Sequence, residues 1–81
     1  MNYTSHYPAA IIITDTNTHT GRFGKIHALS QAVIETMVAE NITENGSSNT
    51  ITSVVLKQNV EVEGVITSIK LSSGELIAYR L

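Results

Sequence analysis

The side chains best suited to acid–base or metal chemistry in this sequence are three histidines, His6, His19 and His27, together with Asp15. Asp15 precedes His19 by four residues, and a hairpin could bring His19 opposite His27. The sequence has no His-Glu-x-x-His pair, no calcium-loop spacing and no cysteine to complete a metal site. Isolated histidines are usually polar surface groups, so we predict no catalytic residue, no metal site and no cofactor.

A glycine-containing segment at 21–25, Gly-Arg-Phe-Gly-Lys, is weakly similar to a phosphate-binding loop. The phosphate-loop pattern requires a glycine where His19 stands and Ser or Thr where Ile26 stands, so this segment fails at both positions. We therefore expect its two glycines to permit a turn and a bend. Arg22 and Lys25 are then edge charges or contacts to a negatively charged partner surface.

The remaining candidates for catalysis are serines and paired carboxylates. Eight serines are present, but none lies in a Gly-x-Ser-x-Gly turn. Glu61 and Glu63 are two residues apart, which in a strand places them on one face at about 7 Å. Glycosidase carboxylates have similar separations but need a cleft. Because these glutamates alternate with Val60 and Val62, we expect them to face solvent, and we predict that the protein is not an enzyme.

The composition favours β structure. Ten Ile, seven Val and ten Thr make up a third of the 81 residues, and β-branched side chains prefer strands to helices. The length suits one small core. We predict an all-β, single-domain β-sandwich or barrel over residues 1–81, with residues 1–8 as an N-terminal arm.

Charge and hydropathy exclude several partners. Five basic against seven acidic residues give a net charge of −2, which does not suit a nucleic-acid binder that relies on a basic surface. No apolar run approaches the roughly 18–20 residues of a membrane helix. The early apolar run is also too short for a signal peptide and lacks a basic segment before it. We therefore expect neither nucleic acid nor membrane as a partner.

Strands are expected where apolar residues are continuous or alternate. We predict residues 9–14 to be buried on both faces, and residues 45–49, Asn-Gly-Ser-Ser-Asn, to form a turn. The apolar phase changes after Gly64, which predicts a bulge there. The expected strands are residues 9–14, 22–29 with a bend at Gly24, 50–57, a segment from residue 60 to the turn at 72–74, and 75–81.

The segment at residues 30–39 fits two structures. Val33, Ile34, Met37 and Val38 have helical spacing, and Ser30 is a suitable helix N-cap. The same segment also alternates as a strand would. We favour a strand because the rest of the sequence is β-rich, with one short helical turn near residues 31–39 as the alternative.

The C-terminal sequence Gly64-Val-Ile-Thr-Ser-Ile-Lys-Leu-Ser-Ser-Gly-Glu-Leu-Ile-Ala-Tyr-Arg80 resembles the ending of small phage virion proteins, G-x-I-T-S-I-x-L-x-S-G-x-x-I-A-Y-[RK]. Segments 24–29 and 32–37 are similar to the N-terminal half of such proteins, so the resemblance spans roughly residues 10–81. The shared motifs are turn glycines and β-branched alternation. One departure is Lys57-Gln58-Asn59, where the family carries Pro-Ala-Gly or a similar turn.

This resemblance implies a virion protein that decorates the capsid surface after synthesis in the host cytoplasm. We expect a capsid cement protein that bridges capsomers, with the major capsid protein as its partner and a homotrimer as its assembly. The alternative is a receptor- or carbohydrate-binding module of a tail fibre or spike, and a second alternative is a regulator that binds one host protein. The residues expected at a subunit or capsid interface are Tyr3, Tyr7, Arg22, Phe23, Ile77, Tyr79 and Leu81.

Overall fold

The computed structural model describes residues 7–81 as six strands, with no helix in that range. The all-β single-domain prediction is confirmed. Tyr3 and His6 lie outside the described residues. The strands are β1 (Ala9–Ile13), β2 (His19–Ala28), β3 (Ala32–Ala39), β4 (Thr50–Leu56), β5 (Glu61–Ser73) and β6 (Leu76–Arg80).

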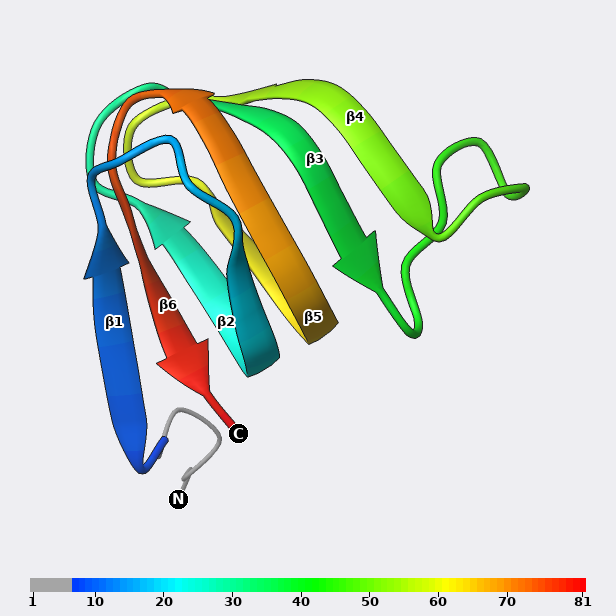
Figure 1. The fold of residues 1–81 in the computed structure, drawn as a ribbon, viewed down its shortest axis with the longest axis horizontal. Coiled ribbons are helices and arrows are strands. Elements are labelled where there is room, and N and C mark those ends of the chain that lie inside the picture. The colour runs from blue at the N-terminus through cyan, green and yellow to red at the C-terminus, as the bar shows by residue number, and fades with distance from the viewer. Residues whose placement is uncertain (1–6) are drawn as a thin grey trace.

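All six strands belong to one antiparallel sheet with the order β1-β6-β2-β5-β3-β4. β1 and β4 are therefore its two edges, and they lie on opposite sides of the molecule in Figure 1. Chain order and sheet order differ, so neighbouring strands come from distant parts of the sequence.

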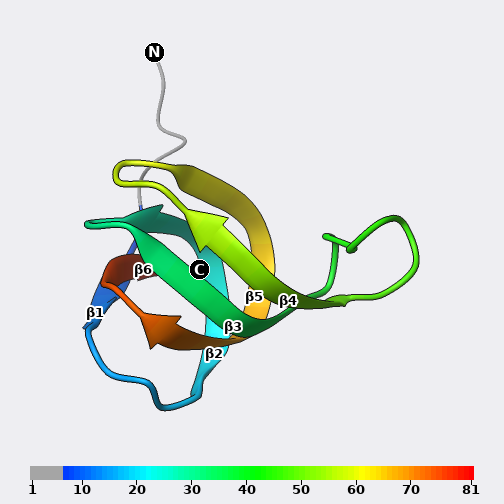
Figure 2. The ribbon, with the colours of Figure 1, turned by 90° about the horizontal axis from the view of Figure 1, so that it is seen from above.

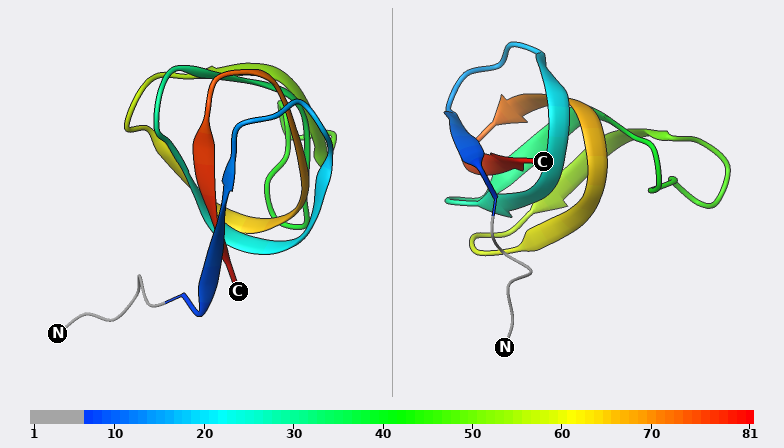
Figure 3. Two further views of the ribbon diagram at one scale, coloured as in Figure 1. Left: turned by 60° about the vertical axis from the view of Figure 1, so that its left-hand side comes forward. Right: turned by 90° about the horizontal axis from the view of Figure 1, so that it is seen from below.

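The sheet curls around one core because its two long strands, β2 and β5, each pair with a different neighbour on either side. Near the end of β2, Ile26 pairs with Val62 of β5 and with Ala78 of β6. Near its start, Thr20 pairs with Ser68, which also pairs with Val38 of β3. Figure 3 shows the resulting barrel-like curvature from two sides.

Strand bends leave a pattern in the buried residues. Four strands carry a pair of inward-facing apolar residues three positions apart, where a regular strand would place them two or four apart. In β4 the bend contains Ser53, whose φ of 57° is left-handed. Register shifts accompany the bends in β2, β3 and β5. The four pairs are Phe23 and Ile26, Ile34 and Met37, Ile51 and Val54, and Ile66 and Ile69.

These bends decide two of the sequence predictions. Residues 32–39 form strand β3, so the short helical turn does not occur. A shift between β2 and β5 lies opposite Gly64, as the bulge prediction expected. The change of inward phase comes later than predicted, however, because Ile66 is still buried and the phase changes between Ile66 and Ile69.

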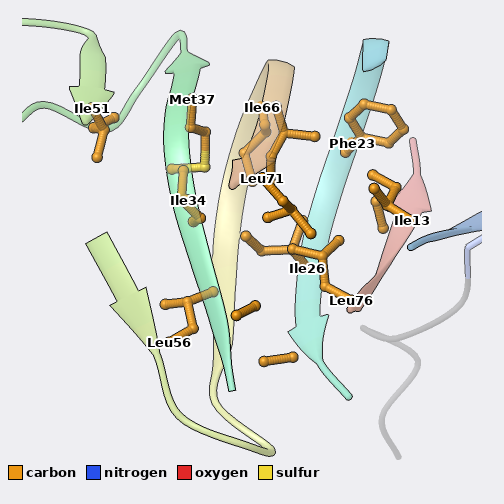
Figure 4. Close-up of a cluster of buried hydrophobic side chains, with 14 of the residues drawn as sticks. Ile13, Phe23, Ile26, Ile34, Met37, Ile51, Leu56, Ile66, Leu71 and Leu76 are labelled. Carbon is orange, nitrogen blue, oxygen red and sulfur yellow. The ribbon is translucent and has the colours of Figure 1, made fainter. Parts of the chain in front are cut away.

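Among the described residues the core consists only of apolar side chains, which come from all six strands, and Figure 4 shows ten of them labelled. Phe23 is fully buried, and its ring lies 5.5 Å from the Arg80 guanidinium carbon. In residues 7–81 no buried side-chain polar atom lacks a hydrogen-bond partner. The fold is therefore held by apolar burial and the strand ladder.

The segment that joins β3 to β4 projects from the sheet as a loop (Figure 2). Its tip is Asn45-Gly46, with φ values of 55° and 74°, and Glu44 bridges to Ser48 behind it. The turn expected at 45–49 is present. At its base, Asn41 Oδ1 accepts a 2.8 Å hydrogen bond from the Val65 backbone N–H.

Candidate interaction surface

The outer face of four strands, β1, β6, β2 and β5, carries two rows of side chains that face away from the core. Residues directly opposite each other in paired strands point to the same face. The first row runs Ile12, Ile77, His27 and Glu61, and the second runs Ala10, Tyr79, Lys25 and Glu63. We call Ile12, Ile77, Tyr79, Lys25, His27 and Glu61 the outer-face patch.

The β1 side of the outer-face patch is apolar. Ile12 is 63% exposed and lies directly opposite the half-buried Ile77. Residues 9–14 were predicted to be buried on both faces, and this is wrong, because β1 is an edge strand with only its inward face covered. The β1 side of the patch therefore offers one exposed apolar side chain, Ile12, beside a half-buried one.

Tyr79 occupies the middle of the outer-face patch. Its ring centroid lies 5.5 Å from that of Tyr7, at an interplanar angle of 33°, and 5.5 Å from Lys25 Nζ. Gly24 makes this arrangement possible, because a Cβ there would lie 2.7 Å from Tyr7 and 2.6 Å from Leu81. Three residues expected at an interface, Tyr7, Tyr79 and Leu81, are thereby brought together.

The β5 side of the outer-face patch is ionic and centres on Glu61. Glu61 Oε2 lies 2.9 Å from His27 Nδ1 and 3.5 Å from Lys25 Nζ. His27 Nε2 is 3.3 Å from Asn59 Oδ1. The hydrogen bond from His27, aided by the charge of Lys25, lowers the pKa of Glu61 below its ordinary value. Glu61 therefore stays ionised and holds both basic side chains in place.

The surface offers an apolar strip, a tyrosine pair and a fixed ionic cluster on one convex face. Within residues 7–81 no three His, Asp or Glu side chains are placed to hold a metal ion. No helix in this part of the chain is long and apolar enough to cross a membrane.

The other predicted residues lie elsewhere. Phe23 is in the core, since the bend in β2 turns it inward, so it offers no ring to a partner. Arg22 is exposed, 3.6 Å from Glu40. Asp15 accepts a 2.8 Å hydrogen bond from His19, which, with a backbone bond from Asn17, lowers the pKa of Asp15.

Sequence reasoning missed three members of the outer-face patch and the neighbouring Asn59. Ile12 was expected to be buried, while Lys25, His27 and Asn59 were not singled out as a cluster with Glu61. His27 and Glu61 are 34 positions apart, so only the pairing of β2 with β5 brings them together. The only indication in the sequence was the alternation of Glu61 with Val60 and Val62, which predicted that Glu61 faces outward.

Comparison with known proteins adds no information on the fold or on the outer-face patch. No protein-family model, curated protein or solved structure matches the chain.

Proposed function

We propose that this protein is a non-enzymatic phage structural protein that decorates the capsid and stabilises it by bridging capsomers. The resemblance of residues 64–80 to phage virion proteins suggests this role. Its partner is then the major capsid protein, and a homotrimer is the assembly proposed for the shell, where threefold positions are available. A cement protein needs a surface that adheres to another protein rather than a pocket that encloses a substrate.

The outer-face patch is the observation that carries the proposal. It combines an exposed isoleucine, a partly exposed tyrosine and a charged cluster, the mixture found where protein surfaces meet. Tyrosine at such a place contributes apolar area and a hydroxyl. Charges around the apolar strip provide register and partner choice.

The tyrosine pair favours a second candidate function, a receptor- or carbohydrate-binding module of a tail fibre or spike. Partly exposed aromatic rings beside polar groups suit stacking against sugars, and Tyr7 and Tyr79 lie near Lys25 and the Glu61 cluster. Phe23 was another candidate ring for this role and is buried. The two tyrosines also pack on each other, which leaves less of each ring free, so capsid decoration remains the first proposal.

Counting copies in purified particles separates these functions. Quantitative mass spectrometry against the major capsid protein should find on the order of hundreds of copies if the protein decorates the shell symmetrically. About a dozen copies or fewer supports the fibre or spike alternative. Absence from particles contradicts both and leaves the regulator that binds a host protein.

Charge reversal tests the surface itself. Glu61→Lys removes the centre of the ionic cluster, so we expect it to weaken attachment to particles by roughly tenfold or more. Glu35→Lys is the matched control, because Glu35 is also exposed and pairs with a lysine, Lys70 at 3.0 Å, outside the outer-face patch. Equal losses in both variants, or no loss in Glu61→Lys, contradict a role for this surface.

A further inference from the structure

The two edges of the sheet are built differently. An edge strand leaves backbone N–H and C=O groups free to pair with another strand, and proteins usually obstruct such edges. On β4 the Thr52 N–H is already bound by the Glu44 carboxylate at 2.8 Å. Ser53, with its left-handed φ of 57°, further interrupts β4 at mid-strand. The β4 edge is therefore poorly suited to pairing.

The β1 edge has none of these obstructions. Its sequence, Ala9-Ala-Ile-Ile-Ile13, contains no charge, no glycine and no proline. All five residues pair with β6 without a register shift, so the strand is regular. Among residues 7–81 no side chain donates to or accepts from its outer edge. The most exposed large apolar side chain of the described residues, Ile12, lies on it.

We propose that β1 pairs antiparallel with β1 of a second copy of this chain, around a twofold axis at Ile11. This register uses all five residues and sets Ala10 of each copy opposite Ile12 of the other, and Ala9 opposite Ile13. Small side chains thus meet large ones on both faces of the joined sheet. Residues that face the core in one copy lie beside core-facing residues of the other, since directly opposite residues point to the same face of the sheet. The five residues are thus complementary to themselves.

Charge and area are consistent with this occupant. An uncharged strand meets its own copy without repulsion, whereas charged strands facing themselves repel. A contact between two strands of five residues buries less than the roughly 1,000 Å² that a stable, specific interface exceeds, so the dimer depends on concentration. The contact closes at two copies and does not depend on any capsid role.

Sedimentation velocity over a concentration series tests the pairing. The wild-type protein should shift towards twice the 8.8 kDa monomer mass as concentration rises. Ile12→Lys should weaken the dimer on the order of a hundredfold, since each copy loses an apolar contact and gains a charge. Val55→Lys is the matched control, because Val55 is 53% exposed on the β4 edge. It should dimerise as the wild type does.

Two further measurements address the register. Adding Ala10→Glu to Ile12→Lys should restore the dimer, because the new acid of one copy faces the new base of the other. The chain has no cysteine, so Ile11→Cys should form a disulfide-linked dimer under mild oxidation. Ala9→Cys should not, because two copies of residue 9 lie about 13 Å apart along the strands in this register.

Several outcomes overturn the proposal. A wild-type protein that is monomeric at about 1 mM lacks even the weakest contact of this kind. A threefold mass in solution contradicts a twofold contact. A dimer unaffected by Ile12→Lys, or weakened equally by Val55→Lys, does not use the β1 edge. Cross-linking that is as efficient through Ala9→Cys as through Ile11→Cys excludes the register.

Discussion

Replacing Gly74 by alanine tests how the turn between β5 and β6 closes one end of the sheet. Gly74 has a φ of 87°, and a Cβ there would meet the Gln31 carbonyl and lie 2.5 Å from Ala32 Cα. Both contacts are backbone, which cannot rotate away. Glu75 O accepts a 2.9 Å hydrogen bond from the Leu29 N–H, so the two turns are held against each other.

Gly74→Ala combines the cost of a left-handed backbone with the cost of overpacking, and Gly46→Ala measures the first cost alone. Gly46 also has a positive φ, 74°, but a Cβ there meets nothing within 4 Å. A left-handed alanine costs roughly 1–2 kcal/mol, partly offset in the unfolded chain, so Gly46→Ala should lose about 1 kcal/mol. Overpacking adds about 1–3 kcal/mol more, so Gly74→Ala should lose about 3 kcal/mol.

Thermal unfolding followed by circular dichroism measures both variants. At roughly 4–8 °C per kcal/mol for a domain of this size, Gly46→Ala should lower Tm by about 5 °C and Gly74→Ala by about 15 °C or more. If the two variants lose the same stability, the backbone approach at Gly74 contributes nothing. The close contact of this turn with residues 31 and 32 would then not determine stability.

Two further predictions concern the outer-face patch. Tyr79→Ala should lower the free energy of unfolding by about 1–2 kcal/mol in denaturant titration, because Tyr79 is half-buried. A fully buried aromatic would lose roughly 3–5 kcal/mol, and a loss of that size contradicts this placement. Since the His27 hydrogen bond lowers the pKa of Glu61, its stabilisation is present above the ordinary value of 4.5 and is lost as the pH falls through the lower folded-state pKa. Glu61→Gln should therefore show a shallower loss of stability below pH 4.5, and an unchanged pH slope contradicts this contribution.

Much of the strand content could be predicted, because it depends on local sequence. Strands β1, β4 and β6 lie within a residue or two of the expected ranges, since each is a largely apolar run that follows turn residues. Residues 30–39 were ambiguous for a physical reason. The bend in β3 puts Ile34 and Met37 on one face, and this three-residue spacing is also that of a helix.

The surface could be predicted only in part, because it depends on strand order. Alternation alone placed Glu61 and Glu63 on an outer face, and both are exposed. Which strand lies beside them is set by long-range pairing, since β5 lies between β2 and β3. Phe23 was expected at an interface, but the bend in β2 turns its ring into the core.

The two proposals meet on the same face of the molecule. In the sheet, β1 and β5 are three strand spacings apart, about 14 Å before curvature, so the β1 edge and the Glu61 cluster do not compete for space. A twofold pair joined through β1 would carry two outer-face patches on one continuous sheet, with their Glu61 clusters about 34 Å apart before curvature. A dimer that carries two outer-face patches attaches more strongly than a single patch does, since the second contact forms within an already bound molecule. A weak strand-edge dimer is thus an alternative to the homotrimer proposed for the shell. It turns a modest single contact into stable decoration, because a bridge between neighbouring subunits of a shell needs two such contact points.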